Sequence, residues 1–378
     1  MLLKDNANRK RIVAGLMSGT SVDAIDVAIT RISPSGPNID VEVIAYREFP
    51  WSSTERDAIL SVSTNDVSAQ MIAVVDRLIG ERFSDALAAL VEPIGVTIDA
   101  IGFHGQTVAH VPVAPVGFAP STLQLGNPHA CARVFRCPVV FDFRRADLLS
   151  GGQGAPLVPA ADSLMFHREV QCHPIAIQNI GGVGNVTYLA PKSAPIGFDT
   201  GPGNMVLDQV MAARTNKLFD RGGEVAAGGV VISEMLNALH RWHQPIPPPV
   251  SYGREHFGPP FVNRLLTEWG NEETADIMAT VSEWTATTIT NAFQQLPSIP
   301  ERIFMAGGGS KNSDLIARLE RLLGRRFQPL DHLGITSDAR EAVAFAVLAD
   351  ARLRGVAFDL SRVTGSQVLQ GLGAIALP

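Results

Sequence analysis

Residues 12–29, which read Ile12-Val-Ala-Gly-Leu-Met-Ser-Gly-Thr-Ser-Val-Asp-Ala-Ile-Asp-Val-Ala-Ile29, decide the fold class of this chain. They predict a strand, a short hydroxyl-rich turn and a second strand. In the second strand the apolar residues Ile25, Val27 and Ile29 alternate with Ala24, Asp26 and Ala28, and a period of two is typical of a half-buried strand.

The turn Ser18-Gly19-Thr20-Ser21 offers small side chains, hydroxyl groups and accessible backbone N–H groups, which together can hold a phosphate. Asp23 adds a carboxylate that could hold hydrated Mg²⁺ beside a nucleotide. A purely structural hairpin has the same pattern, so both interpretations stay open on this motif alone.

The composition predicts a folded, two-domain protein. The chain has 378 residues, and single cores seldom grow beyond about 250–300 residues. Hydrophobic residues make up 46% and charged residues 18%, which is too little charge for a disordered chain. A net charge of −6 argues against a nucleic-acid partner and favours a small-molecule partner.

Neither a signal peptide nor a membrane span is expected. The first ten residues lack an apolar core, and no run reaches the roughly 18 apolar residues that a span needs. Cys131, Cys137 and Cys172 are odd in number and match no zinc spacing, so reduced thiols are expected. These features predict a cytoplasmic protein that does not bind membranes.

The first half of the chain predicts an α/β domain. Residues 39–49 read as a third strand and residues 67–91 as a long helix. Two more strands, 98–103 and 139–143, lead into the polar stretches 104–107 and 144–147. Ligand groups gather where strands give way to loops in α/β sheets, so these stretches are expected to face one cleft.

The second half repeats this layout. Residues 175–189 again predict a strand, a glycine-rich turn and a strand, and a further strand is expected at 302–306. Three glycines, 307–309, follow that strand and precede a helix from about Ser313, so backbone there can approach a nucleotide closely. Two similar halves suggest a duplicated fold with a nucleotide between them.

Other phosphate-binding and hydrolase motifs are disfavoured. No Gly-Lys-Ser/Thr occurs, which excludes a Walker P-loop, and the glycines around Gly182 and Gly201 lack the third glycine of a dinucleotide fingerprint. Ser18 and Ser21 lack the nucleophile-elbow setting of a serine hydrolase.

His104 and His110, together with Asp142 or Asp199, invite a metallohydrolase interpretation, but no second histidine stands at helical ligand spacing. Asp199 ends a short apolar strand. It could be a general base on a rigid strand end or the N-cap of the following helix.

Six segments together resemble the anhydro-N-acetylmuramic acid kinases, bacterial cell-wall recycling enzymes of the hexokinase, actin and heat-shock-chaperone ATPase superfamily. They are Gly15-Leu-Met-Ser-Gly-Thr-Ser-Val-Asp-Ala-Ile-Asp26, Gly102-Phe-His-Gly-Gln-Thr107, Asp142-Phe-Arg-Arg-Ala-Asp147 with Gly151-Gly-Gln-Gly-Ala-Pro-Leu-Val-Pro159, Asn179-Ile-Gly-Gly-Val-Gly-Asn185, Gly197-Phe-Asp-Thr-Gly-Pro-Gly-Asn204 and Gly307-Gly-Gly-Ser-Lys-Asn312. Each is weak singly, but six in family order are highly specific.

Three positions depart from the family pattern. Ala24 stands where glycine is usual, Gly184 stands where alanine is common, and Val250-Ser-Tyr-Gly-Arg-Glu255 replaces a loop that usually begins with lysine. The loss of a loop cation could alter how substrate or phosphate is held.

The resemblance implies a two-domain, duplicated actin-like (ribonuclease H-like) α/β fold with a central nucleotide cleft. One lobe would be residues 1–172, joined by a C-terminal helix over 355–378, and the other 173–354. ATP and Mg²⁺ would be required, Asp23 would hold the metal, and a homodimer is implied.

The resemblance also assigns site residues. The ATP-binding residues would be Gly19, Thr20, Ser21, Val22, Asp23, Ala24, Ile25, Asp26, Gly181, Gly182, Asn185, Gly307, Gly308 and Gly309. The sugar-binding residues would be His104, Gln106, Thr107, Arg144, Asp147, Gln153 and Glu341, the last as a second acid group. Asp199 matches the catalytic aspartate.

By the same resemblance, the enzyme would hydrolytically open 1,6-anhydro-N-acetylmuramic acid and phosphorylate it to N-acetylmuramic acid 6-phosphate in peptidoglycan recycling. Two alternatives stay open: another sugar kinase of the superfamily, which would prefer a sugar with a free hydroxyl, and a non-enzymatic ATP-binding module, which would bind ATP without sugar-dependent ADP release.

Overall fold

The chain divides into two compact units. The computed structural model describes residues 9–35, 38–63, 67–244, 246–252 and 254–378. Unit 1 comprises Met1–Arg168 together with Gly334–Pro378, and unit 2 comprises Glu169–Leu333. This division differs from the expected one, because residues 334–354 belong to unit 1. The helix expected over 355–378 is wrong, since that segment consists of turns and a short strand.

Unit 1 is built on a seven-stranded sheet in the order β12-β6-β4-β1-β2-β3, with β5 paired to β4. β1 pairs antiparallel with β2, and β2 with β3, whereas β1, β4 and β6 run parallel. The strands are β1 (Arg11–Ser18), β2 (Ala24–Ser35), β3 (Asn38–Pro50), β4 (Ala100–Val111), β5 (Ser121–Leu125), β6 (Val139–Phe141) and β12 (Ala374–Ala376). The helices are α1 (Ser53–Val62), α2 (Ala69–Val91), α3 (His129–Phe135), α4 (Arg145–Leu149), α5 (Val158–Met165) and α13 (Arg340–Arg354).

Unit 2 has a five-stranded sheet in the order β11-β10-β7-β8-β9. Its strands are β7 (Ile175–Ile180), β8 (Val183–Leu189), β9 (Ile196–Pro202), β10 (Arg302–Ala306) and β11 (Phe327–Pro329). Its helices are α6 (Asn204–Arg214), α7 (Glu224–Ala227), α8 (Ser233–Trp242), α9 (Arg254–Phe257), α10 (Pro259–Trp269), α11 (Thr274–Phe293) and α12 (Ser313–Leu323). Short 3₁₀ turns lie at Arg221–Gly223, Gly308–Lys311 and Leu330–Leu333.

The two sheets share one topology, which confirms the predicted duplication. In each unit the first three strands form an antiparallel meander, and two further strands continue the sheet in parallel on the other side of the first, β4 and β6 in unit 1 and β10 and β11 in unit 2. When β5, which pairs with β4 outside this path, is left out of the count, these two strands are the fourth and fifth of each unit. This strand order, third-second-first-fourth-fifth, is the ribonuclease H-like arrangement that the resemblance implied. Unit 1 adds β12 at its edge and β5 beside β4.

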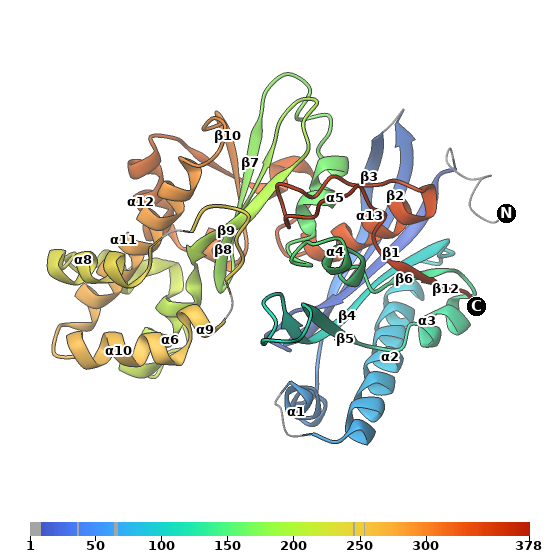
Figure 1. Cartoon of the computed structure of the whole chain (residues 1–378), viewed down its shortest axis with the longest axis horizontal. Helices are drawn as coiled ribbons and strands as arrows, with labels where there is room; N and C mark the ends of the chain where they lie inside the picture. Colours follow the sequence, from blue (N-terminus) through green and yellow to red (C-terminus); the bar gives the residue numbers. More distant parts are fainter. Residues whose placement is uncertain (1–8, 36–37, 64–66, 245, 253) are drawn as a thin grey trace. The chain divides into compact units, whose positions relative to one another are not determined.

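Helices α2 and α13 cover opposite faces of the unit 1 sheet (Figure 1). Successive side chains of a strand point to opposite faces, so alternate residues of β1 can pack against the two helices. Ala14 and Leu16 pack into the core with α2. Gly15, between them, lies directly against α13, where a Cβ would meet Ala342 O at 1.8 Å.

We expect Gly15→Ala to destabilise unit 1, because the new methyl group would overlap the backbone of α13 and push the helix away from the sheet. Overpacking of this kind typically costs about 1–3 kcal/mol. Thermal denaturation should show a lower Tm than wild type. Gly228→Ala is the control, because Gly228 has a negative φ and a Cβ there meets nothing closer than 3.6 Å. Equal Tm values for the two variants would contradict this reading of the close approach.

Two buried ion pairs hold α13 in place. Arg340, at the start of the helix, donates to Asp162 of α5, and both side chains are almost completely buried. Near the other end, Arg11 Nη1 of β1 donates to Asp350 Oδ1 at 2.7 Å, and Asp350 also pairs with Arg354. The helix is therefore fixed at both ends to elements from the first half of the chain.

Cys131, Cys137 and Cys172 are all free, and the first two are buried, as expected for reduced thiols. Burial raises the pKa of both buried thiols to about 12, so neither is a reactive thiolate at neutral pH. In the part of the chain that the structure describes, no helix has the length and apolar character to cross a membrane.

Candidate active site

The turn between β1 and β2 is held rigidly by hydrogen bonds from three directions. Val22 N donates to Gly19 O at 3.1 Å within the turn. From β4, Gln106 Nε2 donates to the same oxygen at 3.0 Å. Trp51 Nε1 donates to Ser18 Oγ at 3.1 Å. Thr20 and Ser21 remain exposed at the tip, so the turn is a fixed platform with its hydroxyls facing outward.

Asp23 is exposed beside this turn, and the residues around it fit a hydrated Mg²⁺. Its Oδ1 accepts from Ser21 Oγ at 2.6 Å and from Ala24 N at 3.2 Å, which orients the carboxylate. Among the described residues no three His, Cys, Asp or Glu side chains gather as a metal cage. Mg²⁺ does not need one, since it commonly uses one or two carboxylates, substrate phosphates and several waters.

Three of the expected ATP-binding residues have side chains that make contacts within the protein. The side chains of Val22 and Ile25 lie in the core of unit 1, so only their backbone could face a nucleotide. Asp26 is half-buried and accepts from Tyr46 Oη at 2.6 Å. Burial, together with the smaller effect of the charges of Glu48, Glu341 and Asp23, raises the pKa of Asp26 to about 7 although the hydrogen bond from Tyr46 lowers it. A carboxyl in such acidic surroundings is a poor partner for phosphate.

The polar stretch 104–107 was expected after the end of a strand, but it lies inside one. β4 continues to Val111 because β5 folds back and pairs with its second half, with Gln106 opposite Leu125 and Thr107 opposite Gln124. Gln124 Nε2 also donates to Thr107 Oγ1 at 3.2 Å. The stretch is therefore presented by a rigid two-stranded ribbon.

His104 and Arg144 form one hydrogen-bonded unit. Arg144 Nε donates to His104 Nε2 at 3.1 Å, and Nη1 donates to Gly154 O at 2.9 Å. Because the guanidinium can only donate, Nε2 must be the acceptor. We therefore assign the imidazole proton to Nδ1, which lies 2.9 Å from Gly105 O. Burial, reinforced by the charge of Arg144, lowers the pKa of His104 to about 3, so this histidine is neutral and cannot act as the acid or base at neutral pH.

Asp147 is completely buried and holds the loop that carries Gln153. Its Oδ2 accepts from Gly154 N at 2.7 Å, and its Oδ1 accepts from Thr364 Oγ1 and Gln370 Nε2, each at 2.7 Å. Gln153 N donates to Thr364 O at 2.9 Å. Asp147 was expected to touch the sugar, and the structure instead gives its carboxylate oxygens partners within unit 1.

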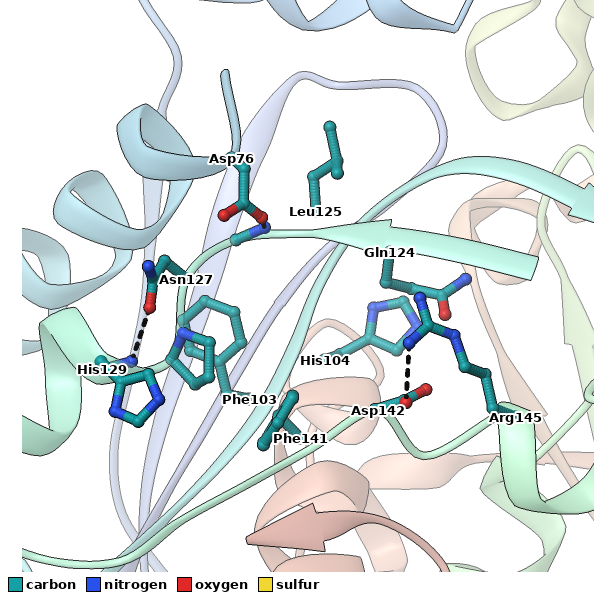
Figure 2. Close-up of a pocket in the computed structure, with 12 residues that line it drawn as sticks. Asp76, Phe103, His104, Gln124, Leu125, Asn127, His129, Phe141, Asp142 and Arg145 are labelled. Atoms are coloured by element: carbon teal, nitrogen blue, oxygen red, sulfur yellow. Dashed lines mark hydrogen bonds and ion pairs between the residues drawn. The ribbon is translucent and has the colours of Figure 1, made fainter. Parts of the chain in front are cut away.

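A cavity of about 280 Å³ lies beside His104, next to the middle of β4 and the end of β6 (Figure 2). His104, Gln124, Asp142 and Arg145 lie on one side of the view, and Asp76, Asn127 and His129 lie on the other. Arg145 Nη1 donates to Asp142 Oδ2 at 3.2 Å. The polar walls suit a hydroxyl-rich ligand. Glu341 is not part of this cavity and lies exposed in the first turn of α13.

In unit 2 the expected glycine-rich segments come together. The hairpin turn Gly181–Gly182 is fixed by the start of α6, where Asn204 N donates to Gly181 O at 2.8 Å and Gly203 N to Gly182 O at 3.0 Å. Gly307, with a φ of +79°, packs so closely that a Cβ would lie 2.6 Å from Ile180 O. Residues 307–309 and the hairpin thus form one small-residue surface, and its contact with a nucleotide stays a prediction.

Asp199 lies in a row of polar residues across three neighbouring strands. On β9 it is directly opposite Asn185 of β8, which in turn is opposite Asn179 of β7. Directly paired residues have Cβ atoms about 4.5–5.5 Å apart, so these side chains share one end of the sheet. Asn185, expected at the ATP phosphates, is thereby the cross-strand neighbour of Asp199.

The carboxylate of Asp199 is held by a loop that the sequence did not single out for this role. Tyr252 N donates to Asp199 Oδ2 at 2.7 Å, and the Ser251 hydroxyl also hydrogen-bonds to the side chain. Asp199 N donates to Val250 O at 3.0 Å. Burial raises the pKa of Asp199 to about 7 although both hydrogen bonds lower it. A half-buried carboxyl with this pKa is suited to accept a proton near neutral pH.

Comparison with known protein families gives one match that covers nearly the whole chain. The family model described as "Anhydro-N-acetylmuramic acid kinase" matches residues 11–378. The chain belongs to the anhydro-N-acetylmuramic acid kinase family. All six segments on which the resemblance rested lie within the match, and that recognition is confirmed.

Relatives with the same family name match from end to end. The anhydro-N-acetylmuramic acid kinase of Picosynechococcus sp. is 38% identical, with 97% of this chain and 99% of the relative covered. That of Caldanaerobacter subterraneus is 36% identical over 100% and 99%, and that of Vibrio cholerae is 35% identical over 98% and 99%. Among solved structures, the activator of a 2-hydroxyisocaproyl-CoA dehydratase from Clostridium difficile is more distant, with a TM-score of 0.45, 11% identity, and 91% of this chain and 96% of that chain covered.

Proposed function

We propose that this chain carries out the reaction for which its family is named, on 1,6-anhydro-N-acetylmuramic acid with ATP, and yields N-acetylmuramic acid 6-phosphate for peptidoglycan recycling. The observation that carries the proposal is the setting of Asp199. Asp199 does not end its strand as expected, because β9 continues to Pro202. A carboxyl in the middle of a rigid strand, with a pKa of about 7 and two donors holding it, can remove a proton from water.

The chemistry requires such a base because a 1,6-anhydro sugar has no free 6-hydroxyl. Asp199 takes a proton from water as the water oxygen bonds to the anomeric carbon, and the bond between that carbon and the 6-oxygen breaks. The released 6-oxygen bonds to the γ-phosphorus of ATP, and the bond from that phosphorus to the ADP oxygen breaks. One anhydro sugar, one water and one ATP give the sugar phosphate, ADP and a proton.

The phosphate groups of ATP would be bound by the exposed turn residues Gly19–Ser21 and by the small-residue surface at Gly181, Gly182 and 307–309. Mg²⁺, which Asp23 would hold, supplies positive charge to the transferring phosphoryl group. Backbone N–H groups fixed by hydrogen bonds add to this electrostatic stabilisation without reorganising during the reaction.

The sugar would be bound on unit 1 by His104, Thr107, Arg144 and Gln153, with Glu341 as a second acidic group. Gln106 and Asp147 act through the protein in this proposal. Gln106 clamps the first turn and Asp147 fixes the loop of Gln153, as their hydrogen bonds indicate. Arg144 keeps its charge, since burial lowers its pKa only to about 10.

We also infer that the enzyme works in the cytoplasm, where ATP is available and its free thiols stay reduced. A homodimer remains part of the proposal on the strength of the family resemblance.

The pH dependence of kcat/KM should reflect the ionisation of Asp199. Because the base works only when it is deprotonated, kcat/KM for the sugar should rise with pH and level off above about 7. Initial rates measured from pH 5 to 9 at saturating Mg-ATP check this. Asp208→Asn is the control, since Asp208 of α6 is another carboxyl whose pKa burial raises, to about 6, and its removal should leave the limb in place. A limb near pH 4 would argue against Asp199 as the base.

The reaction itself is tested by ADP release from Mg-ATP and 1,6-anhydro-N-acetylmuramic acid in ¹⁸O-labelled water, with mass analysis of the sugar phosphate. One labelled oxygen at the anomeric carbon supports coupled ring opening and phosphoryl transfer. ADP release only with an ordinary sugar would point to another sugar kinase, and ATP binding without sugar-dependent release to a binding module.

A further inference from the structure

Residues 250–252 hold Asp199 in position through backbone hydrogen bonds. They accept the backbone N–H of Asp199 through Val250 O and donate Tyr252 N–H to the carboxylate. Val250 stands where the family usually has lysine, and its side chain is buried in the core of unit 2. Asp199 therefore receives no cation from this position and depends on neutral hydrogen bonds, whose geometry is set by where Tyr252 lies.

Tyr252 is itself fixed through its ring. The ring is buried, packs edge-on against His243 at 5.1 Å between centroids and against Phe257 at 5.5 Å. Its hydroxyl accepts from Ile246 N at 3.4 Å. Because the backbone N–H that binds Asp199 belongs to the same residue, the contacts that fix this ring also restrain the position of the hydrogen bond to the carboxylate.

His243 lies at the centre of these contacts. It follows the end of α8, and its ring also packs edge-on against Phe257 at 5.0 Å and against Trp284 at 6.2 Å. His243, Tyr252, Phe257, Phe261 and Trp284 form what we term the aromatic cluster.

His243 also contacts the strand that carries Asp199. Its Nε2 lies beside Gly201, two residues after Asp199 on β9, where a Cβ would be 3.6 Å from that nitrogen. Nε2 is buried and has no hydrogen-bond partner among the described residues. Burial, with the nearby His256 and His240, lowers the pKa of His243 to about 4, so the ring is neutral. The imidazole serves here as a flat, neutral spacer between β9 and Tyr252.

We propose that His243 is a positioning residue for Asp199, which holds the Tyr252 N–H against the carboxylate by packing between Tyr252 and Gly201. This inference rests on the proposed role of Asp199 as the base. It assigns the aromatic cluster a role in turnover. A small misplacement of a base lowers the reaction rate far more than it weakens substrate binding.

His243→Ala should lower kcat for sugar-dependent ADP release by about 10- to 100-fold, with KM for ATP and sugar changed less than about threefold. His243→Phe, which keeps a flat ring and removes the unpartnered nitrogen, should retain most of the wild-type kcat.

Trp242→Ala is the matched control. Trp242 is the neighbouring aromatic residue, and it packs against Phe261 and Arg264 with no ring contact to Tyr252. It should lose stability without the fall in kcat. Equal kcat values for the His243→Ala and Trp242→Ala variants, or a His243→Phe variant as slow as His243→Ala, would overturn the proposal.

Tyr252→Ala provides a second route if His243→Ala fails to fold, since it removes the ring and keeps the backbone N–H. It should lower kcat to a similar degree, and where both variants fold the double variant should be little slower than either single one, because both act through one contact. Additive losses would contradict this. Asp199→Asn separates the two proposals: full turnover in that variant removes the proposed base itself, whereas a collapse of turnover with normal His243 variants removes only the positioning role.

Discussion

Asp199→Asn should lower the rate of sugar-dependent ADP release by about 10²- to 10⁴-fold, the usual range for loss of a general base. The amide keeps the shape of the side chain and its oxygen can still accept from Tyr252 N. It cannot accept a proton from water. Binding of ATP and sugar, measured by titration calorimetry, should therefore stay close to that of wild type while kcat collapses.

Asp208→Asn again serves as the comparison, because it removes a carboxyl with a raised pKa from the same unit, on α6. It should turn over like wild type. If both variants were equally impaired, the effect would belong to the charge balance of unit 2 and not to Asp199. If neither were impaired, Asp199 would have no part in proton removal.

The second large effect should come from Asp162→Ala, a change that breaks a buried ion pair within unit 1. Asp162 and Arg340 are both buried, and removal of the carboxylate leaves a guanidinium desolvated without its charge partner. Breaking a buried pair in this way typically costs about 3–5 kcal/mol. At about 2–4 °C per kcal/mol for a unit of this size, the Tm should fall by about 6–20 °C.

Two further variants make that measurement specific. Glu81→Ala breaks the exposed Arg77–Glu81 pair, whose side chains are 79% and 53% exposed, and should change stability by less than about 1 kcal/mol. Replacing both buried partners, as Asp162→Leu with Arg340→Met, should recover most of the loss because no unpaired charge remains. A double variant as unstable as Asp162→Ala would mean that packing, not the unpaired charge, sets the cost.

The elements that carry the fold could be predicted because their apolar residues follow a regular period. Helix α2 and strand β10 lie within about two residues of the expected bounds, and the β1–turn–β2 hairpin was expected correctly except that β2 continues past Ile29 to Ser35. The stretch 104–107 was misplaced because β4 is extended by pairing with β5, a short strand with little pattern of its own. Pairing partners far along the chain decide where a strand ends, and a local pattern does not contain that information.

The candidate site shows a different limit to what can be predicted from the sequence. Gln106 and Asp147 were expected to contact the sugar, yet their side chains bind a turn and a loop of the protein. A ligand contact and a loop contact call for the same polar residue types, so sequence alone does not separate them. Tyr252 was missed for the opposite reason, since it binds Asp199 through a backbone N–H that nearly every residue type has.

The return of α13 to the first sheet has a consequence for the protein during its synthesis on the ribosome. Unit 2 is one uninterrupted stretch, so it can complete its fold as soon as residue 333 has emerged. Unit 1 was begun first but lacks the helix that covers Gly15 and Gly102 until the last 45 or so residues follow. The nascent chain thus finishes its second unit before its first, and the face of β1 and β4 that awaits α13 is the surface a chaperone would have to shield in the meantime.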